Sequence, residues 1–383
     1  MHPFLSLAAS HQQEIVALLR EMVECESPSD EPEAVNRFVD LLVERTRDIG
    51  VAKTFRAGRF GKHVRIEFKL PGSRPGRRKD GQLLALGHSD TVWPLGTLRQ
   101  MPFRQEEGRL WGPGVLDMKA GLAFFLYAVG MLRELDVPVA RRVALLVVSD
   151  EEVGSGTSRA ITEAEAKKSA AVLVLEPGTG LTGKLKTSRK GVGAFNLRVE
   201  GQAAHAGVDF TNGASAIVEL ARQIEKISGF TDLERGITVN PGIIGGGTRT
   251  NVVAAEAEAA IDIRIVRERD AARLAMQFQK LRPFDKRCRL TVTGGLNRPP
   301  MERTKAMAAL FSQAKELAVG LGVSLEESST GGGSDGNFTA AVGTPTLDGL
   351  GGVGEGAHAA NESILVDRIA DRTALLARLI QSL

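Results

Sequence analysis

The sequence is dominated by short apolar runs that each end in an acidic side chain or a histidine. The clearest run, Val143–Val148, leads through Ser149 and Asp150 into the adjacent pair Glu151 and Glu152. Two neighbouring carboxylates are costly to bury, because like charges repel and are poorly solvated in a low dielectric. The pair therefore indicates a cation-binding site, provided that other parts of the chain supply further ligands.

Apolar runs of this kind alternate with helical segments in the first part of the chain. Strands are predicted at residues 64–70, 83–87, 140–148 and 171–175, and helices at residues 10–24, 32–48 and 118–135. Pro71–Gly81, rich in proline, glycine and basic residues, is predicted to be an exposed turn. The alternation predicts an α/β fold with a mixed, mostly parallel sheet and helices on both faces. Ligand sites in such sheets lie at the carboxyl ends of the strands.

The pattern changes near residue 188, where the order of predicted elements becomes β-α-β-β-α-β. Strands at residues 193–200, 236–244, 255–266 and 289–293 alternate with helices at residues 214–228 and 270–280. This order is typical of a small α+β sheet with helices on one face. Helix–strand alternation returns at about residue 299 and ends in a helix at residues 366–383. The sequence therefore predicts a discontinuous domain, residues 1–187 and 299–383, that carries an inserted domain at residues 188–298.

Charge and composition bound the class of partner. Lys and Arg total 49 and Asp and Glu total 46, a net charge of +3 that gives no reason to expect nucleic acid or a membrane surface. The longest apolar stretch, around Gly121–Gly130, is expected to be too short to span a bilayer. Two distant cysteines do not suggest a disulfide framework. The first residues lack the pattern of a signal peptide, so a cytoplasmic enzyme is expected, or a periplasmic or secreted one if a leader has been removed.

Further candidate ligands stand at strand ends and in glycine-rich loops. His88 follows the apolar run at residues 83–87, and Asp90, on the same side of an extended chain, can orient its imidazole. Asp117 lies in a glycine-rich bend before a helix, where its two oxygens can bridge two cations. Glu176 ends another apolar run, and His358 lies in a loop before the last helix.

Each of these residues also has a plain structural interpretation. His88 and Asp90 could form a surface turn, Asp117 could cap a helix, and Glu176 could be an ordinary loop residue. Their joint occurrence at strand ends and in glycine-rich loops weakens that interpretation. Two histidines and three carboxylates suit a pair of divalent ions.

At this level of detail the sequence resembles the M20 metallopeptidases, most closely their glutamate carboxypeptidase branch. The matching segments occur in family order and cover most of the chain: Gly87–Val92, Gly112–Gly121, Ser149–Ser155, Leu175–Pro177, Gly201–Gly207, Asn251–Val253, Asp262–Arg264, Gly331–Gly336 and the His358 loop. Because some branches of the family have Asp at the position of Glu176, the glutamate favours the carboxypeptidase-like branch.

The resemblance implies a site for two Zn²⁺ ions per subunit, with Co²⁺ or Mn²⁺ as alternatives. Asp117 would bridge the ions, His88 and Glu176 would complete one ligand set, and Glu152 and His358 would complete the other. Family members often have a cis peptide bond after the bridging aspartate, which is the Asp117–Met118 bond in this sequence.

The resemblance also implies catalytic roles for Glu151 and His205. Glu151 would be the general base, and His205, in the inserted domain, would stabilise the tetrahedral oxyanion. His205 would reach the active site of a partner subunit, so the inserted domain would serve as a dimerisation and lid domain in a homodimer. From the residues alone, His205 could equally be a loop histidine without a role.

Substrate recognition would depend on cationic and amide groups. By resemblance, Arg264, Asn251 and Lys184 bind substrate, and Arg298 binds the α-carboxylate of the C-terminal residue, because a guanidinium fork can meet both carboxylate oxygens. The glycine-rich segment that ends at Gly333 can bring backbone N–H groups close to an anionic substrate. The plain interpretations are an exposed strand charge for Arg264 and a flexible loop for the glycines.

The expected function is a dizinc amide hydrolase that removes a C-terminal residue, preferably glutamate, from a small N-acyl amino acid or short peptide through a metal-activated water. An N-acyl amino acid deacylase of the acetylornithine or succinyl-diaminopimelate type is the alternative enzyme. A non-catalytic binding protein that kept the fold is a third interpretation. A nucleophilic hydrolase is disfavoured, because no Gly-x-Ser-x-Gly elbow with a matching histidine stands out.

Overall fold

The computed structural model describes residues 2–56, 58–72 and 79–383. Most of the turn predicted at Pro71–Gly81 therefore lies outside the described residues. The chain divides into two compact units. Unit 1 consists of Met1–Ser188, Arg303–Ser329 and Ser334–Leu383, and unit 2 consists of Arg189–Glu302 and Thr330–Gly333.

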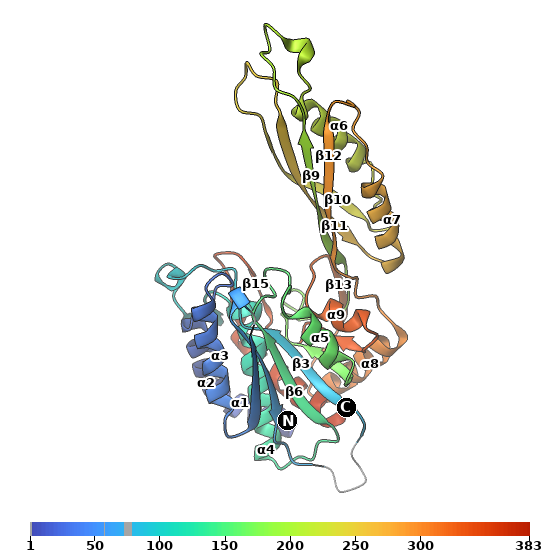
Figure 1. Ribbon diagram of the computed structural model, residues 1–383. Helices are drawn as coiled ribbons and strands as arrows, with labels where there is room; N and C mark the ends of the chain where they lie inside the picture. The colour runs from blue at the N-terminus through green and yellow to red at the C-terminus, as the bar shows by residue number, and fades with distance from the viewer. Residues whose placement is uncertain (1, 57, 73–78) are drawn as a thin grey trace. The chain divides into compact units, whose positions relative to one another are not determined.

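Unit 1 is built on a six-stranded sheet (Figure 1). In spatial order its strands are β1 (Gly50–Arg56), β2 (Lys62–Phe68), β6 (Arg142–Val148), β3 (Gln82–His88), β7 (Ser169–Val174) and β14 (Thr346–Leu347). The last four are parallel to one another, whereas β1 and β2 form antiparallel pairs. The prediction of a mixed, mostly parallel sheet is confirmed. Strand β1 escapes prediction because most of its residues are exposed, so it lacks an apolar pattern.

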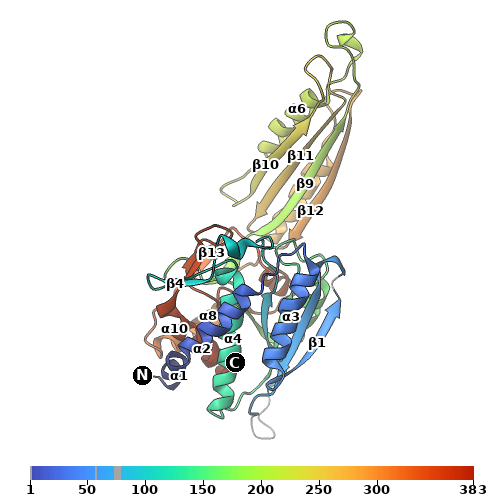
Figure 2. The same cartoon turned by 90° about the vertical axis from the view of Figure 1, so that its left-hand side faces the viewer.

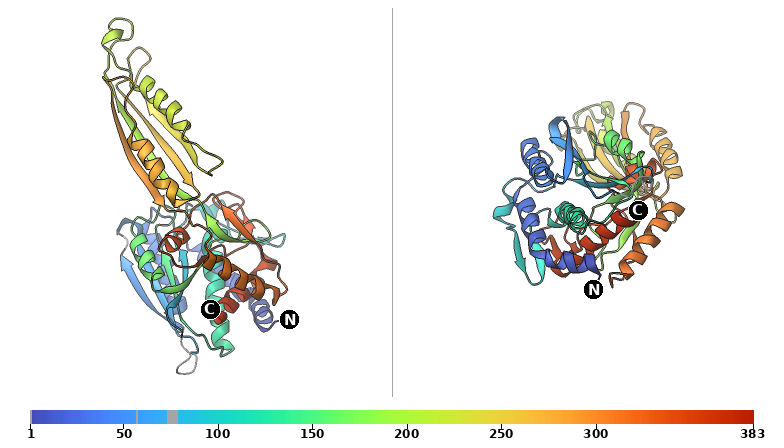
Figure 3. Two further views of the ribbon diagram at one scale, coloured as in Figure 1. Left: turned by 90° about the vertical axis from the view of Figure 1, so that its right-hand side faces the viewer. Right: turned by 90° about the horizontal axis from the view of Figure 1, so that it is seen from below.

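Each face of this sheet has its own core, because alternate side chains of a strand point to opposite faces. Leu83 and Ala85 join a large core with helices α1 (Pro3–Ser10), α2 (Gln12–Glu24), α3 (Pro32–Thr46), α4 (Ala120–Glu134), α8 (Lys305–Val319) and α10 (Ile369–Ser382). Leu84 and Leu86 join a smaller core with α5 (Arg159–Ala166), and α9 (Gly336–Ala341) packs against α5 and β7. Helices thus cover both faces, as predicted, and Figure 3 (right) shows α4 end-on in the middle of unit 1.

The segment Val115–Glu134 is long and apolar enough to cross a membrane, so the expectation that this stretch is too short is wrong. However, 83% of its most apolar window is buried inside the protein. Packing of α4 against α10, α1 and α2 accounts for this apolar character.

A small second sheet in unit 1 brings distant loops together. Its order is β15 (Gly354–Glu355), β16 (Ser363–Leu365), β5 (Arg109–Trp111) and β4 (Arg104–Glu106), all antiparallel. The register pairs Trp111 with Ser363, so the segments that carry Asp117 and His358 start from adjacent strand ends. Separately, β8 (Leu185–Arg189) and β13 (Glu327–Thr330) form a two-stranded sheet.

Unit 2 has the predicted element order: β9 (Gly191–Glu200), α6 (Ala216–Ser228), β10 (Thr238–Gly246), β11 (Glu256–Ile265), α7 (Glu268–Gln279) and β12 (Arg289–Arg298). Its antiparallel sheet has the order β10-β11-β9-β12. Both helices lie on one face of this sheet (Figures 2 and 3), where Phe195, Leu220 and Phe278 belong to a common core. The alternating exposure of β9 leaves the other face open to solvent.

Candidate metal centre

His88 is the last residue of β3, and its side chain is only 2% exposed. Its Nδ1 atom lies 2.9 Å from the main-chain oxygen of Asp90. Because a carbonyl oxygen only accepts hydrogen bonds, the neutral ring carries its proton on Nδ1 and presents a lone pair on Nε2. The Asp90 carboxylate is 3.5 Å from Nδ1. The expectation that the carboxylate of Asp90 orients the His88 ring is therefore corrected. Asp90 does orient the ring, but chiefly through its main-chain oxygen.

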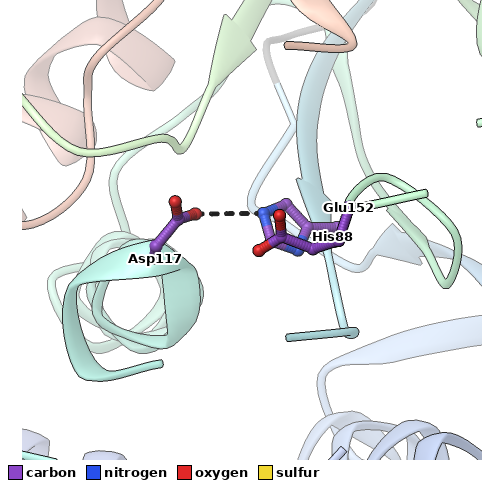
Figure 4. A group of neighbouring side chains, drawn as sticks. All are labelled: His88, Asp117 and Glu152. Atoms are coloured by element: carbon purple, nitrogen blue, oxygen red, sulfur yellow. Dashed lines mark hydrogen bonds and ion pairs between the residues drawn. The ribbon is translucent and has the colours of Figure 1, made fainter. Parts of the chain in front are cut away.

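Asp117 lies between the two histidines. Its Oδ1 is 3.2 Å from Nε2 of His88, and its Oδ2 is 3.3 Å from Nε2 of His358. Figure 4 shows the aspartate pointing from the start of its helix toward the ring of His88, beside which Glu152 lies. The Asp117–Met118 peptide bond is cis, which confirms that expectation. The helix predicted from residue 118 begins at Ala120 as α4, because Asp117 and Met118 have non-helical backbone angles.

Two further carboxylates complete the cluster. Glu176 Oε1 lies 3.7 Å from His88 Nε2, and Glu152 Oε1 lies 3.2 Å from His358 Nε2. The arrangement has two halves, one with His88 and Glu176 and one with His358 and Glu152, and Asp117 is common to both. This is a geometry in which one carboxylate can bridge two cations.

Burial and charge interactions shift the pKa values of His88, Asp117, Glu152 and His358. Burial alone would lower the pKa of His88, but interactions with the carboxylates of Asp117 and Asp90 outweigh it and hold the pKa well above its usual value. Hydrogen bonds to Asp117 and Glu152 raise the pKa of His358 to about 10. Burial raises the pKa of Glu152 to about 6 against the opposing pull of His358. The carboxylates thus draw positive charge to the position between them.

The donor chemistry fits divalent ions. Ligand atoms of His88, Asp117 and Glu152 all lie within 4.8 Å of one another. Imidazole nitrogen with carboxylate oxygen is a combination that zinc and similar borderline cations accept. The fixed Nδ1–H of His88 leaves Nε2 as the donor atom, which is the usual condition of a metal-bound histidine.

Asp90 has a second task at this centre. Its buried carboxylate accepts hydrogen bonds from the backbone N–H of Glu151 at 3.3 Å and of Glu152 at 3.2 Å, and from the hydroxyl of Ser29 at 2.8 Å. The turn that carries both glutamates is therefore anchored to the residue that orients His88. Glu151 is half-buried and adjacent in sequence to Glu152.

One residue of the centre escapes sequence reasoning. Glu362, four positions after His358, is buried and accepts hydrogen bonds from the backbone N–H groups of Gly114, Leu116 and Asp117. In the sequence it is an acidic residue at the end of a loop. Only the pairing of β16 with β5 shows that it meets the glycine-rich bend.

The remaining candidates lie outside this cluster. In unit 2, the loops of His205 and Asn251 lie together, since the Ala206 N–H donates to the Asn251 carbonyl at 2.9 Å. The His205 ring accepts a hydrogen bond from the Gly207 N–H at 3.2 Å. In unit 1, Lys184 forms an ion pair with Glu326 at 2.6 Å, so its ammonium group has a protein partner.

Two arginines of unit 2 converge on the glycine loop that ends at Gly333. Arg264 donates to the Gly331 carbonyl at 3.3 Å and also pairs with Asp262 at 2.9 Å. Arg298 is buried and packs so closely on Gly333 that an added Cβ would come within 2.8 Å of its Cδ. Glycine is required at this contact, because the guanidinium stem occupies the space of a side chain.

The fold and this donor set define a metal-dependent hydrolase. The chain belongs to peptidase family M20/M25/M40, whose model matches residues 84–382. It is 30% identical over 389 residues to carboxypeptidase G2 of Pseudomonas sp. (strain RS-16), covering 98% of this chain and 91% of that protein. It is also 29% identical over 268 residues to the acetylornithine deacetylase of Klebsiella pneumoniae, covering 65% of this chain and 67% of the other.

Solved structures share the fold. Aminopeptidase PepT from Bacillus cereus has a TM-score of 0.77 at 22% identity and covers 97% of this chain and 98% of its own. The M20 family metallo-carboxypeptidase Sso-CP2 from Sulfolobus solfataricus has a TM-score of 0.75 at 17% identity, with 96% and 98% coverage. The prediction of a metal-dependent hydrolase of the carboxypeptidase-like M20 type is confirmed by the family match and the full-length relative.

Proposed function

We propose that the protein is a dizinc carboxypeptidase that cleaves a C-terminal residue, preferably glutamate, from an N-acyl or peptidyl conjugate. The main support is that the two oxygens of Asp117 face two different histidines, at 3.2 Å and 3.3 Å. Each histidine also has another carboxylate beside it. A single-ion site has no need of this duplicated arrangement. Zn²⁺ suits the donors best, with Co²⁺ or Mn²⁺ as substitutes.

In this proposal each half holds one ion. His88 and Glu176 serve the first, His358 and Glu152 serve the second, and Asp117 serves both. When bound, the ions supply Lewis-acid polarisation of the scissile carbonyl and acidify the attacking water. Glu151 accepts the proton that this water loses and returns it to the nitrogen of the leaving amine as the amide C–N bond breaks. Asp90 fixes the backbone from which Glu151 projects.

Unit 2 supplies the groups that hold substrate. His205 donates to the developing oxyanion in the active site of a partner subunit. Asn251 and Arg264 bind substrate, Arg298 binds the α-carboxylate of its C-terminal residue, and the loop at Gly333 offers backbone N–H groups to the anionic substrate. The convergence of Arg264 and Arg298 on one glycine loop supports a carboxylate-binding role. Lys184, in unit 1, is a further candidate; like Arg264, which pairs with Asp262, it already has a carboxylate partner, Glu326.

We further propose a homodimer formed through unit 2. Strand β10 is at an edge of its sheet, and it exposes Ile243 (70%) and Ile244 (61%). An edge strand with exposed apolar side chains is a natural surface for association with a second copy. Sedimentation of the wild type against I243K/I244K tests it, because a dimer that survives the double substitution would exclude this surface.

Removal of a C-terminal residue is supported by the full-length similarity to carboxypeptidase G2. The similarity to acetylornithine deacetylase favours the second candidate, an N-acyl amino acid deacylase with a small acyl pocket. Turnover of N-benzoyl-glutamate, N-acetylornithine and matched non-acidic N-benzoyl amino acids, with zinc analysis of the same sample, separates the two. We expect about two zinc ions per chain and the fastest hydrolysis of the glutamate conjugate. Faster turnover of N-acetylornithine would replace the proposal by the deacylase.

A further inference from the structure

We propose that Glu362 is the positioning residue that ties three ligand-bearing loops together and so presets the metal centre, an inference that rests on the proposed function. Its side chain is buried, at 1% exposure. It accepts hydrogen bonds from the backbone N–H groups of Gly114 at 2.8 Å, Leu116 at 2.9 Å and Asp117 at 3.0 Å. A fourth comes from the Trp93 indole N–H at 2.8 Å.

The four bonds join two other parts of the centre to the loop of Glu362: three come from the glycine-rich bend and one comes from the loop after β3. Trp93 follows His88 in the loop after β3, Asp117 is the shared carboxylate, and Glu362 itself shares a loop with His358. The backbone N–H of Asp117 is held directly, so the carboxylate fixes the main chain from which the bridging ligand projects. Movement of any one of the three loops would break hydrogen bonds inside a buried site, where unmade bonds are costly.

The sheet explains how Glu362 comes to this position. It directly precedes β16, which pairs with β5 in a register that places Ser363 opposite Trp111. The Gly112 N–H reaches the Glu362 carbonyl at 3.4 Å, so the pairing runs on into both loops. The carboxylate therefore enters the glycine-rich bend from the neighbouring strand.

The chemistry requires a carboxylate at this position. Oε2 receives the Gly114 and Trp93 hydrogens, and Oε1 receives those of Leu116 and Asp117. A glutamine has one acceptor oxygen, and its NH₂ group would face two N–H donors whichever way the amide is turned. Glu362→Gln keeps the volume and removes half of the acceptor capacity, which makes it a specific test.

The test is the affinity of the metal-free protein for Co²⁺ alone, followed by its visible absorption, and for Zn²⁺ by competition. We expect Glu362→Gln to raise the Kd by about 10- to 100-fold, the effect typical of losing a group that orients a metal ligand. The matched control is Glu219→Gln, because Glu219 is also buried and accepts from the backbone N–H groups of Phe284 and Asp285, but in unit 2. Glu219→Gln is expected to keep the wild-type Kd, even if its thermal unfolding midpoint falls by as much as that of Glu362→Gln.

A wild-type Kd for Glu362→Gln would overturn the inference, and so would an equal loss of affinity in Glu219→Gln. If Glu362→Gln does not fold, Trp93→Phe decides, because it removes one of the four donors and leaves the carboxylate. That variant is expected to raise the Kd by about two- to tenfold, the equivalent of one hydrogen bond. An unchanged Kd in Trp93→Phe would then count against the inference. Wild-type protein that binds no metal would instead refute the proposed function, so the two failures are distinguishable.

Discussion

Strand β3 begins at Gln82 and ends at His88, and its two ends treat buried charge in opposite ways. At the amino end, the Glu165 carboxylate receives hydrogen bonds from Arg65 at 2.9 Å, Gln82 at 2.9 Å and Lys168 at 2.8 Å. Burial alone would raise the pKa of Glu165, but these donors outweigh it and lower the pKa to about 2. At the carboxyl end, burial raises the pKa of Glu152 to about 6 despite His358.

The opposite pKa shifts of Glu165 and Glu152 distinguish a carboxylate that stabilises the fold from one that is suited to bind a ligand. A carboxylate with a depressed pKa is already satisfied by the protein, so it contributes to folding. A buried carboxylate with a raised pKa lacks compensation in the metal-free protein and gains most from an added cation. The amino end is therefore complete by itself. At the carboxyl end, His88 and His358 lower the pKa of Asp117, but Glu152 remains without full compensation until a cation binds.

The largest effect is expected from substituting Asp117, the carboxylate that both halves of the metal centre share. Asp117→Asn replaces one of the two oxygens that face His88 and His358 by an NH₂ group, so the side chain can no longer serve both halves. We expect kcat/KM to fall on the order of 10³-fold and at least one metal equivalent to be lost. Metal analysis and turnover of N-benzoyl-glutamate measure both. Glu165→Gln, at the other end of the sheet, is the control and is expected to keep the wild-type metal content.

The next effect concerns the amino end and is one of stability. Glu165→Gln removes the charge that Arg65 and Lys168 compensate, and we expect it to destabilise unit 1 by about 2 kcal/mol at pH 7. The native pKa of Glu165, about 2, lies below the usual 4.5. Its contribution is therefore complete above pH 4.5 and is lost as pH falls through about 2.

Urea unfolding followed by tryptophan fluorescence checks this prediction, because both tryptophans, Trp93 and Trp111, belong to unit 1. The difference between wild type and variant should shrink as pH is lowered from 5 toward 2. A difference that is constant across this range would mean that the charge of Glu165 does not contribute, and that only its packing does.

The strand ends also show what sequence reasoning can reach. The apolar run at residues 83–87 predicts β3, and the histidine, aspartate and glutamates placed at strand ends and in glycine-rich bends are the residues that the structure brings together. Local patterns succeed here because parallel strands present their carboxyl ends at one edge of the sheet. By contrast, α1 and β1 escape prediction, because a short terminal helix and an exposed edge strand carry little periodic signal.

Long-range contacts account for what sequence reasoning misses. The spacing of His88 and Asp90 selects the right residues, but the main-chain oxygen of Asp90, and not its carboxylate, makes the shorter contact with the ring. The role of Glu362 depends on the pairing of β16 with β5, whose members lie far apart in the sequence. The contact between Glu362 and the glycine-rich bend depends on the register of this strand pair. Short strands specify their register only weakly on their own, so the sequence does not predict the contact.

The smallest effect is expected from Glu152→Gln. It should change the stability of the metal-free protein in the opposite direction to Glu165→Gln, and so it tests the contrast between the two ends of β3 most directly. In the metal-free protein the pKa of Glu152, about 6, lies above the usual 4.5, so its charged form is disfavoured in the folded state. The penalty grows as pH rises from 4.5 to about 6 and is complete above that. Glu152→Gln should therefore stabilise the metal-free protein by about 1 kcal/mol at pH 7 and leave it unchanged at pH 4.

Adding Zn²⁺ should reverse this order, because the wild type gains the stabilisation of a bound ion and the variant has lost one ligand for it. Thermal unfolding of both proteins, with chelator and with excess Zn²⁺, measures the reversal. If Glu152→Gln destabilises the metal-free protein at pH 7 as Glu165→Gln does, the carboxyl end is as fully compensated as the amino end, and the contrast between them fails. If Glu152→Gln is more stable than the wild type without metal and less stable with it, Glu152 lowers the stability of the metal-free fold and raises that of the metal-bound protein.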